Sequence, residues 1–149
     1  GRAMKYHGGV PKEDVFEKNN AALEKGMANL DKHYENLKKY GVNVIVCLNK
    51  FNTDTDEEID IVRKHCEKLG YDFTVSSAYA DGGSGAIELA QKVIDAPKGK
   101  FKVLYKLDSP IESKVRKICK EIYGAKTIHF SKLAKEYESK YEPIVDTEE

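Results

Sequence analysis

The chain has 149 residues and a mass of 16.8 kDa, which is enough for one domain with its own core, or for one domain and part of another. It has 25 Lys and Arg against 25 Asp and Glu, so it lacks the overall basic field of nucleic-acid-binding proteins. No apolar run approaches the ~18 residues of a membrane span, and no signal-peptide pattern opens the sequence. The three cysteines, Cys47, Cys66 and Cys119, have no CxxC spacing. We therefore expect a cytoplasmic protein with reduced thiols and no zinc site.

A long amphipathic helix is the first predicted element. Leu and Phe recur at seven-residue intervals over 12–40, and Gly41 ends the pattern. A coiled coil is the alternative interpretation of this spacing. The apolar, β-branched run 42–48 follows, and such runs are typical of a parallel strand covered on both faces.

The rest of the chain continues to alternate between the two patterns. Strands are predicted over 73–77, 101–105 and 127–130, and helices over 55–69, 86–94, 110–123 and 131–140. This alternation predicts an α/β fold with a parallel sheet flanked by helices. The expected organisation is an α/β segment over 1–99, a small α/β segment over 100–142, and a frayed acidic tail over 143–149.

Two loops follow predicted strand ends, which is where α/β sheets bind ligands. The first loop, 49–55, carries Phe51, a large aromatic ring that could serve as a platform for a flat ligand. The alternative is that this loop only begins a helix. In that case Asp54 with Glu57, or Thr55 with Glu58, would form a capping box.

The second loop, 76–85, is rich in glycine and precedes a predicted helix. Its glycines Gly82, Gly83 and Gly85 permit close approach of the backbone, and free amides at a helix start favour an anion or a polar heterocycle. Tyr79 supplies a second aromatic ring. Phe51 and Tyr79 on neighbouring loops could therefore clamp a planar ligand.

Several common kinds of catalytic site are not indicated by the sequence. There is no GxxxxGK(S/T) phosphate loop, so this chain has no visible means of holding ATP phosphates. The pair Asn49-Lys50 resembles the base-reading loop of P-loop GTPases, but Asn52 stands where guanine reading needs an Asp. No nucleophile–His–acid arrangement is evident, and we predict no catalytic residue. His7, beside two glycines, is the one histidine that we take as a candidate binding residue.

Five blocks along the chain are distinctive together. They are RAMKYHGGVP (2–11), NLDKHYEN (29–36), NKFNTDT (49–55), YADGGSG (79–85) and EIYGA (121–125). In this order they resemble the formate–tetrahydrofolate ligase family over about residues 2–141. The resemblance implies a P-loop NTPase-like α/β fold and the ATP-dependent joining of formate to tetrahydrofolate, with ATP, Mg²⁺ and tetrahydrofolate bound by the whole enzyme.

The resemblance also implies how the chain relates to the whole enzyme. In the family, the phosphate loop and the formate-activating residues lie upstream of the part that this chain matches. The chain is therefore expected to be the central to C-terminal portion of a multidomain ligase, inactive alone, with the P-loop domain of the same enzyme as its partner.

The implied binding residues lie in the two loops. The family holds the folate ring against aromatic residues at the positions of Phe51 and Tyr79, the latter usually Trp in bacterial relatives. Asn52 replaces a common Pro, whereas Thr53 and Asp54 match. The resemblance places the glycines of the second loop near the nucleotide.

A non-catalytic module is the alternative function. The striped helix 12–40 could dock on another domain or on a second copy of the chain, giving a homo-oligomer. We expect neither nucleic acid nor membrane as a partner.

Overall fold

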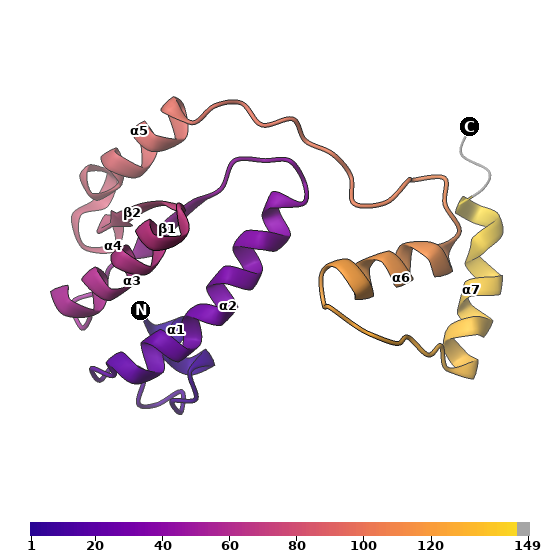
Figure 1. Cartoon of the computed structure of the whole chain (residues 1–149), viewed down its shortest axis with the longest axis horizontal. Coiled ribbons are helices and arrows are strands. Elements are labelled where there is room, and N and C mark those ends of the chain that lie inside the picture. The colour runs from indigo at the N-terminus through magenta and orange to yellow at the C-terminus, as the bar shows by residue number, and fades with distance from the viewer. Residues whose placement is uncertain (146–149) are drawn as a thin grey trace. The chain divides into compact units, whose positions relative to one another are not determined.

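The structure, a computed structural model, describes residues 1–145 (Figure 1). The chain divides into two compact units, Gly1–Lys100 and Phe101–Glu149. Within the described residues, no helix combines the length and the apolar character that crossing a membrane requires.

The first unit has α/β architecture. In chain order it contains α1 (Arg2–His7), α2 (Asn20–Lys38), β1 (Ile45–Asn49), α3 (Asp56–Leu69), β2 (Asp72–Ser76), α4 (Ala78–Asp81), the 3₁₀ helix η1 (Gly82–Ala86) and α5 (Ile87–Asp95). The strands β1 and β2 pair in parallel, with α3 as the crossover between them. The predicted α/β class with a parallel sheet and flanking helices is confirmed, with two strands in the described part of the chain.

The core lies where α2 and α3 pack against the sheet. Its buried members are Leu23, Met27, Val46, Leu48, Ile59, Val62, Cys66 and Phe73. Burial alternates along β1, because Val46 and Leu48 are buried whereas Cys47 and Asn49 are exposed. The prediction of a strand covered on both faces is therefore wrong. Helix α5 contacts both strands but does not cover the side chains of Cys47 and Asn49.

Helix α2 begins at Asn20, so the prediction of one helix over 12–40 is wrong at its start. Asn19 is the N-cap, and its Oδ1 accepts a hydrogen bond of 3.0 Å from the Ala22 amide. Residues 12–17 form turns that bury Val15 and leave Phe16 half exposed. The apolar stripe of α2 packs on the unit's own core, with Leu30 among its partly buried members.

Two glycines let α1 pack closely against α2. A Cβ on Gly26 would lie 1.8 Å from the carbonyl oxygen of Met4, and one on Gly8 would lie 1.9 Å from that of Ala22. No side chain fits at either position. Gly26 is therefore the point of α2 at which the backbone of α1 makes its closest approach.

The second unit contains two helices, α6 (Ile111–Glu121) and α7 (Lys132–Val145). Helix α6 follows Pro110 as predicted, and Ser131 Oγ accepts a 3.1 Å hydrogen bond from the Ala134 amide at the start of α7. The predicted strands 101–105 and 127–130 do not form. Neither segment has a partner strand within residues 101–145, and a lone strand leaves its backbone groups unpaired.

The predicted tail 143–149 falls partly within the structure. Residues 143–145 belong to the end of α7, and residues 146–149 lie outside the described residues.

Candidate functional site

The register of the sheet brings the two candidate loops together. Asn49, at the end of β1, lies opposite Ser76, at the end of β2. The Lys50 amide then donates a 2.8 Å hydrogen bond to the Ser76 carbonyl, which extends the pairing into the loops. Both loops therefore leave the sheet side by side at its carboxyl edge, as the sequence predicted.

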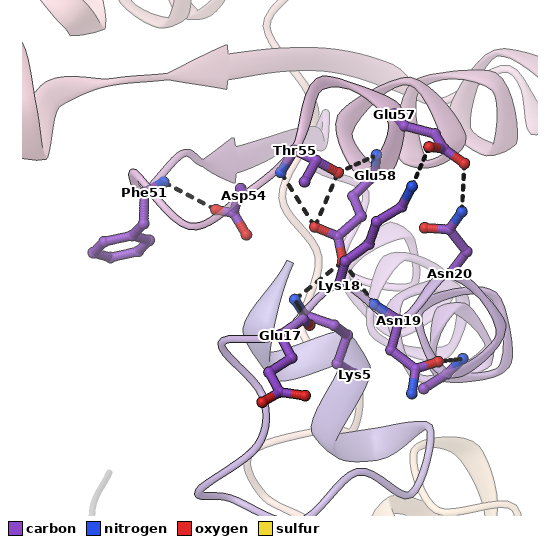
Figure 2. Close-up of polar contacts among 11 residues, drawn as sticks. Lys5, Glu17, Lys18, Asn19, Asn20, Phe51, Asp54, Thr55, Glu57 and Glu58 are labelled. Carbon is purple, nitrogen blue, oxygen red and sulfur yellow. Dashed lines mark hydrogen bonds and ion pairs between the residues drawn. The ribbon is translucent and has the colours of Figure 1, made fainter.

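The first loop is a tight turn closed by Asp54 (Figure 2). The Phe51 amide donates to Asp54 Oδ2 and the Asp54 amide donates to the Phe51 carbonyl, each at 2.9 Å. Asp54 is buried, whereas Asn52 and Thr53 lie exposed on the turn. Asp54 thus holds the backbone of Phe51 instead of capping the next helix.

Helix α3 begins with the Thr55–Glu58 capping box, one of the two predicted alternatives. Glu58 also forms a buried ion pair with Lys5 of α1, in which Lys5 Nζ lies 3.0 Å from Glu58 Oε1. Lys5 donates a second hydrogen bond, of 2.8 Å, to the Glu17 carbonyl. The Asn19 amide donates to the same carboxylate at 3.2 Å (Figure 2). Burial opposes the ionisation of Glu58, but the hydrogen bonds from Lys5 and from two backbone amides outweigh it, so the pKa of this carboxyl is lowered.

A second contact at the start of α3 lies on the surface. Glu57 accepts a 2.6 Å hydrogen bond from Asn20 Nδ2 and pairs with Lys18. The starts of α2 and α3 are therefore joined by two neighbouring carboxylates, and the loop that carries Phe51 ends at this junction (Figure 2).

The second loop is built from α4 and η1. The Ser77 amide donates a 3.0 Å hydrogen bond to the Gly85 carbonyl, which closes the loop on itself. A Cβ on Gly85 would lie 2.5 Å from the Ser77 carbonyl carbon, so this position requires glycine. Gly82 has φ 63° and ψ −143°, a conformation available essentially to glycine alone. Gly83 is exposed, with open space around the position of a Cβ.

The rings of Phe51 and Tyr79 meet where the two loops lie together. Their centroids are 5.0 Å apart and their planes are inclined by 46°. A flat ligand sandwiched between two rings needs about 7 Å between them, twice the ~3.5 Å carbon contact distance. The two rings therefore touch each other and leave no slot between them, while Tyr79 is 74% exposed and offers its outer face.

Arg2 is a member of the site that the sequence analysis did not single out. Its guanidinium lies 3.7 Å from the centroid of the Phe51 ring and 5.3 Å from that of Phe16. A cavity of about 390 Å³ opens beside Phe51, between the start of α1 and β1. Nothing in the spacing of Arg2 and Phe51 in the sequence signals this contact, because it depends on how α1 packs.

His7 does not join the two aromatic loops directly. It is exposed at the end of α1, makes an edge contact with Tyr6 at 5.6 Å, and lines a different cavity that Arg2 shares. His65 also lies away from the aromatic loops, with its Nε2 2.8 Å from Asp31 Oδ1 in a half-buried pair between α2 and α3. In the part of the chain described, no cluster of three or more His, Cys, Asp or Glu could hold a metal ion.

Comparison with known proteins identifies the family. The family model described as formate–tetrahydrofolate ligase matches residues 1–145. The chain is 50% identical over 134 residues to a formate–tetrahydrofolate ligase of Pseudothermotoga lettingae, and 45% identical over 137 residues to one of Parabacteroides distasonis. Each alignment covers 89% of this chain but only 24% and 25% of the respective relative, so the chain spans about a quarter of their length. The chain belongs to the formate–tetrahydrofolate ligase family.

Proposed function

We propose that this chain forms the folate-facing wall of an ATP-dependent formate–tetrahydrofolate ligase. The observation that carries the proposal is the meeting of Phe51 and Tyr79 at the ends of adjacent parallel strands. The relatives' names supply formate and tetrahydrofolate as substrates. Tetrahydrofolate carries a flat pteridine, which is the kind of group that two neighbouring aromatic side chains hold.

In this proposal the two aromatic residues have different tasks. Phe51 is the fixed platform, because Asp54 holds its backbone and Arg2 covers one side of its ring. Tyr79 is the adaptable member, since its side chain is largely exposed. The pteridine stacks on the outer face of Tyr79, or against Phe51 once Tyr79 has rotated outward. Asn52 and Thr53 line the rim.

The glycine loop is proposed to face the nucleotide. Gly83 leaves backbone within reach of a ligand, and Gly82 and Gly85 fix the loop in place beside the start of α5. Free amides at a helix start favour the negative charge of a nucleotide.

In this proposal, the step that uses ATP takes place in another part of the enzyme. The sequence has no phosphate loop and the described residues offer no metal-binding cluster, so we derive no step through ATP phosphates or Mg²⁺ here. Two strands alone make a marginal sheet. We infer that they belong to a larger, P-loop NTPase-like sheet completed by the rest of a cytoplasmic enzyme, and that this chain alone does not form 10-formyltetrahydrofolate.

The alternative of a docking module built on the long helix is not favoured. The stripe that suggested docking is in α2, where Leu23 and Met27 are buried and Leu30 and Tyr34 pack against the same core. Of the stripe residues, Phe16, which lies before α2, and Leu37, near its end, are each about half exposed.

The proposal is tested by calorimetric titration of the chain with tetrahydrofolate under anaerobic conditions. Stacking contributes about 0.5–1.5 kcal/mol beyond area burial, so Phe51→Ala and Tyr79→Ala are each expected to weaken binding about two- to tenfold. Tyr123→Ala is the matched control, because Tyr123 is as exposed as Tyr79 but lies in the second unit. Equal affinities in all three variants would refute the stacking site, and product formed from ATP and formate by the chain alone would refute its inactivity.

A further inference from the structure

A cavity of about 370 Å³ lies wholly within the second unit, where it is lined by residues of α6 and of the segment that leads into this helix. Four of its lining residues have side chains that donate hydrogen bonds, namely Lys106, Ser109, Ser113 and Lys117. The other three form an apolar and aromatic wall, namely Val103, Leu104 and Tyr105. No carboxylate is among the residues that line the cavity.

The positive charge of this cavity has no acidic partner. Within residues 1–145, neither Lys106 nor Lys117 forms an ion pair. By contrast, Arg116 of the same helix is paired with Glu112. Helix α6 has four Lys or Arg side chains against two Glu, so positive charge remains on it after that pairing. Unpaired positive charge in a cavity with a low-dielectric wall attracts anions.

The start of α6 adds to the attraction that the two lysines and two serines already produce. Pro110 is the N-cap of this helix, and it provides no side-chain hydrogen bond to the first amides. Ser109 and Ser113 lie on either side of this start and line the cavity. The positive end of the helix dipole therefore acts in the same direction as the two ammonium groups.

We propose that this cavity binds a dianionic phosphate group carried by a small monoester. Ammonium groups act on phosphate as point charges, whereas a planar carboxylate is matched best by the fork of an arginine. The three terminal oxygens of a phosphate monoester accept hydrogen bonds from Lys106, Lys117 and the two serine hydroxyl groups. The organic part of the ester packs on the wall that contains Tyr105. The site does not involve the aromatic loops of the first unit, so it is independent of the proposed function.

The test adds phenyl phosphate to the isotopically labelled full chain at pH 7.5 and follows binding by NMR. Saturable shifts are expected at the amides of residues 103–117. Lys106→Gln and Lys117→Gln should each weaken binding about two- to fivefold, as expected for the loss of one exposed charge pair. Ser113→Asp places a carboxylate in the cavity and should abolish the saturable shifts. Binding should also weaken at pH 5, because a phosphate monoester loses its second charge below about pH 6.

The matched control is Lys126→Gln/Lys135→Gln. It removes two exposed positive charges from the same unit but lies outside the cavity, so it is expected to bind phenyl phosphate as the unmodified chain does. Equal weakening by the control pair and by the cavity variants would overturn the inference, because the unit would then attract anions without a defined site. The absence of saturable shifts at residues 103–117 would overturn it as well.

Two further probes identify the group that is bound. Benzoate has the ring of phenyl phosphate but a carboxylate in place of the phosphate, and it is expected to bind at least fivefold more weakly. Equal affinities for benzoate and phenyl phosphate would overturn the assignment of phosphate. Inorganic phosphate has the same anionic group without the organic part and should shift the same amides with lower affinity. If it binds as tightly as phenyl phosphate, the phosphate site is supported and the preference for an ester is overturned.

Discussion

The junction of α1, α2 and α3 and the two aromatic loops lie next to each other and differ in almost every physical respect. At the junction, Lys5 and Glu58 are both about 1% exposed and form a dry ion pair with several hydrogen bonds. At the loops, Tyr79 is 74% exposed and no ion pair or hydrogen bond fixes its ring among the described contacts. The junction provides rigidity, and the loops carry exposed groups.

The two regions are coupled through a short stretch of chain. Thr55 caps α3 at the junction, and Asp54, the residue before it, holds Phe51. The position of the aromatic platform therefore depends on the buried frame, while Tyr79 depends on its own loop. Binding groups on loops held by a rigid scaffold are a common arrangement. This arrangement predicts that substitutions at the junction change the free energy of unfolding strongly and that substitutions in the loops change it little.

The largest expected effect is that of Glu58→Gln. It leaves the Lys5 ammonium buried without a counter-charge, which costs about 3–5 kcal/mol. Urea unfolding followed by circular dichroism measures the change. The double variant Lys5→Met/Glu58→Gln removes both charges and should be less destabilised than Glu58→Gln alone. If the double variant is the less stable of the two, the ion pair is not the source of the effect.

Gly26→Ala should destabilise the first unit by about 2–3 kcal/mol. Alanine in place of glycine normally stabilises a helix by about 1 kcal/mol, so a loss here reports the clash of the new Cβ with the Met4 carbonyl. Gly83→Ala is the control, because a Cβ there meets nothing within 4 Å and its φ is not positive. A stable Gly26→Ala variant would show that α1 and α2 can separate without cost.

The fold class could be predicted from the sequence because the hydrophobic pattern of each element is local. Residue types predicted a capping box at the start of α3 but left two alternatives, and the structure has the one formed by Thr55 and Glu58. The start of α2 was missed because the Phe16 pattern continued the heptad across Asn19, and only the packing of the preceding turn shows that Asn19 is the N-cap. The unformed strand 101–105 has a suitable pattern but no partner, and partners are not encoded locally.

The candidate site was predictable only in part, for the same reason. Phe51 and Tyr79 follow strands, so parallel pairing was enough to predict their proximity. Their direct contact, with no slot between them, depends on side-chain orientation. Arg2 lies about fifty residues before Phe51 and reaches its ring only because Gly8 and Gly26 let α1 pack against α2.

The Glu58 carboxyl predicts a pH dependence at the junction. Its pKa is lowered in the folded chain, so its contribution to stability is fully present above the unfolded value of about 4.3 and is lost as the pH falls through the lower folded value. The difference in unfolding free energy between the unmodified chain and Glu58→Gln should therefore shrink below about pH 4. Urea titrations at pH 7 and at pH 3 measure it. A difference that stays constant with pH would show that Glu58 is not ionised in the folded chain.

The smallest expected effect on stability is that of Tyr79→Ala, within about 0.5 kcal/mol, because an exposed side chain loses little on truncation. Phe51→Ala should cost more, since its half-buried ring also contacts Arg2. Thermal unfolding of both variants beside Tyr123→Ala measures the order. A Tyr79 variant as stable as the Tyr123 control but weaker in folate binding would mark Tyr79 as a residue kept for its ligand. If Tyr79→Ala is instead as destabilising as Phe51→Ala, the loop belongs to the rigid frame, and the contrast between junction and loops does not hold.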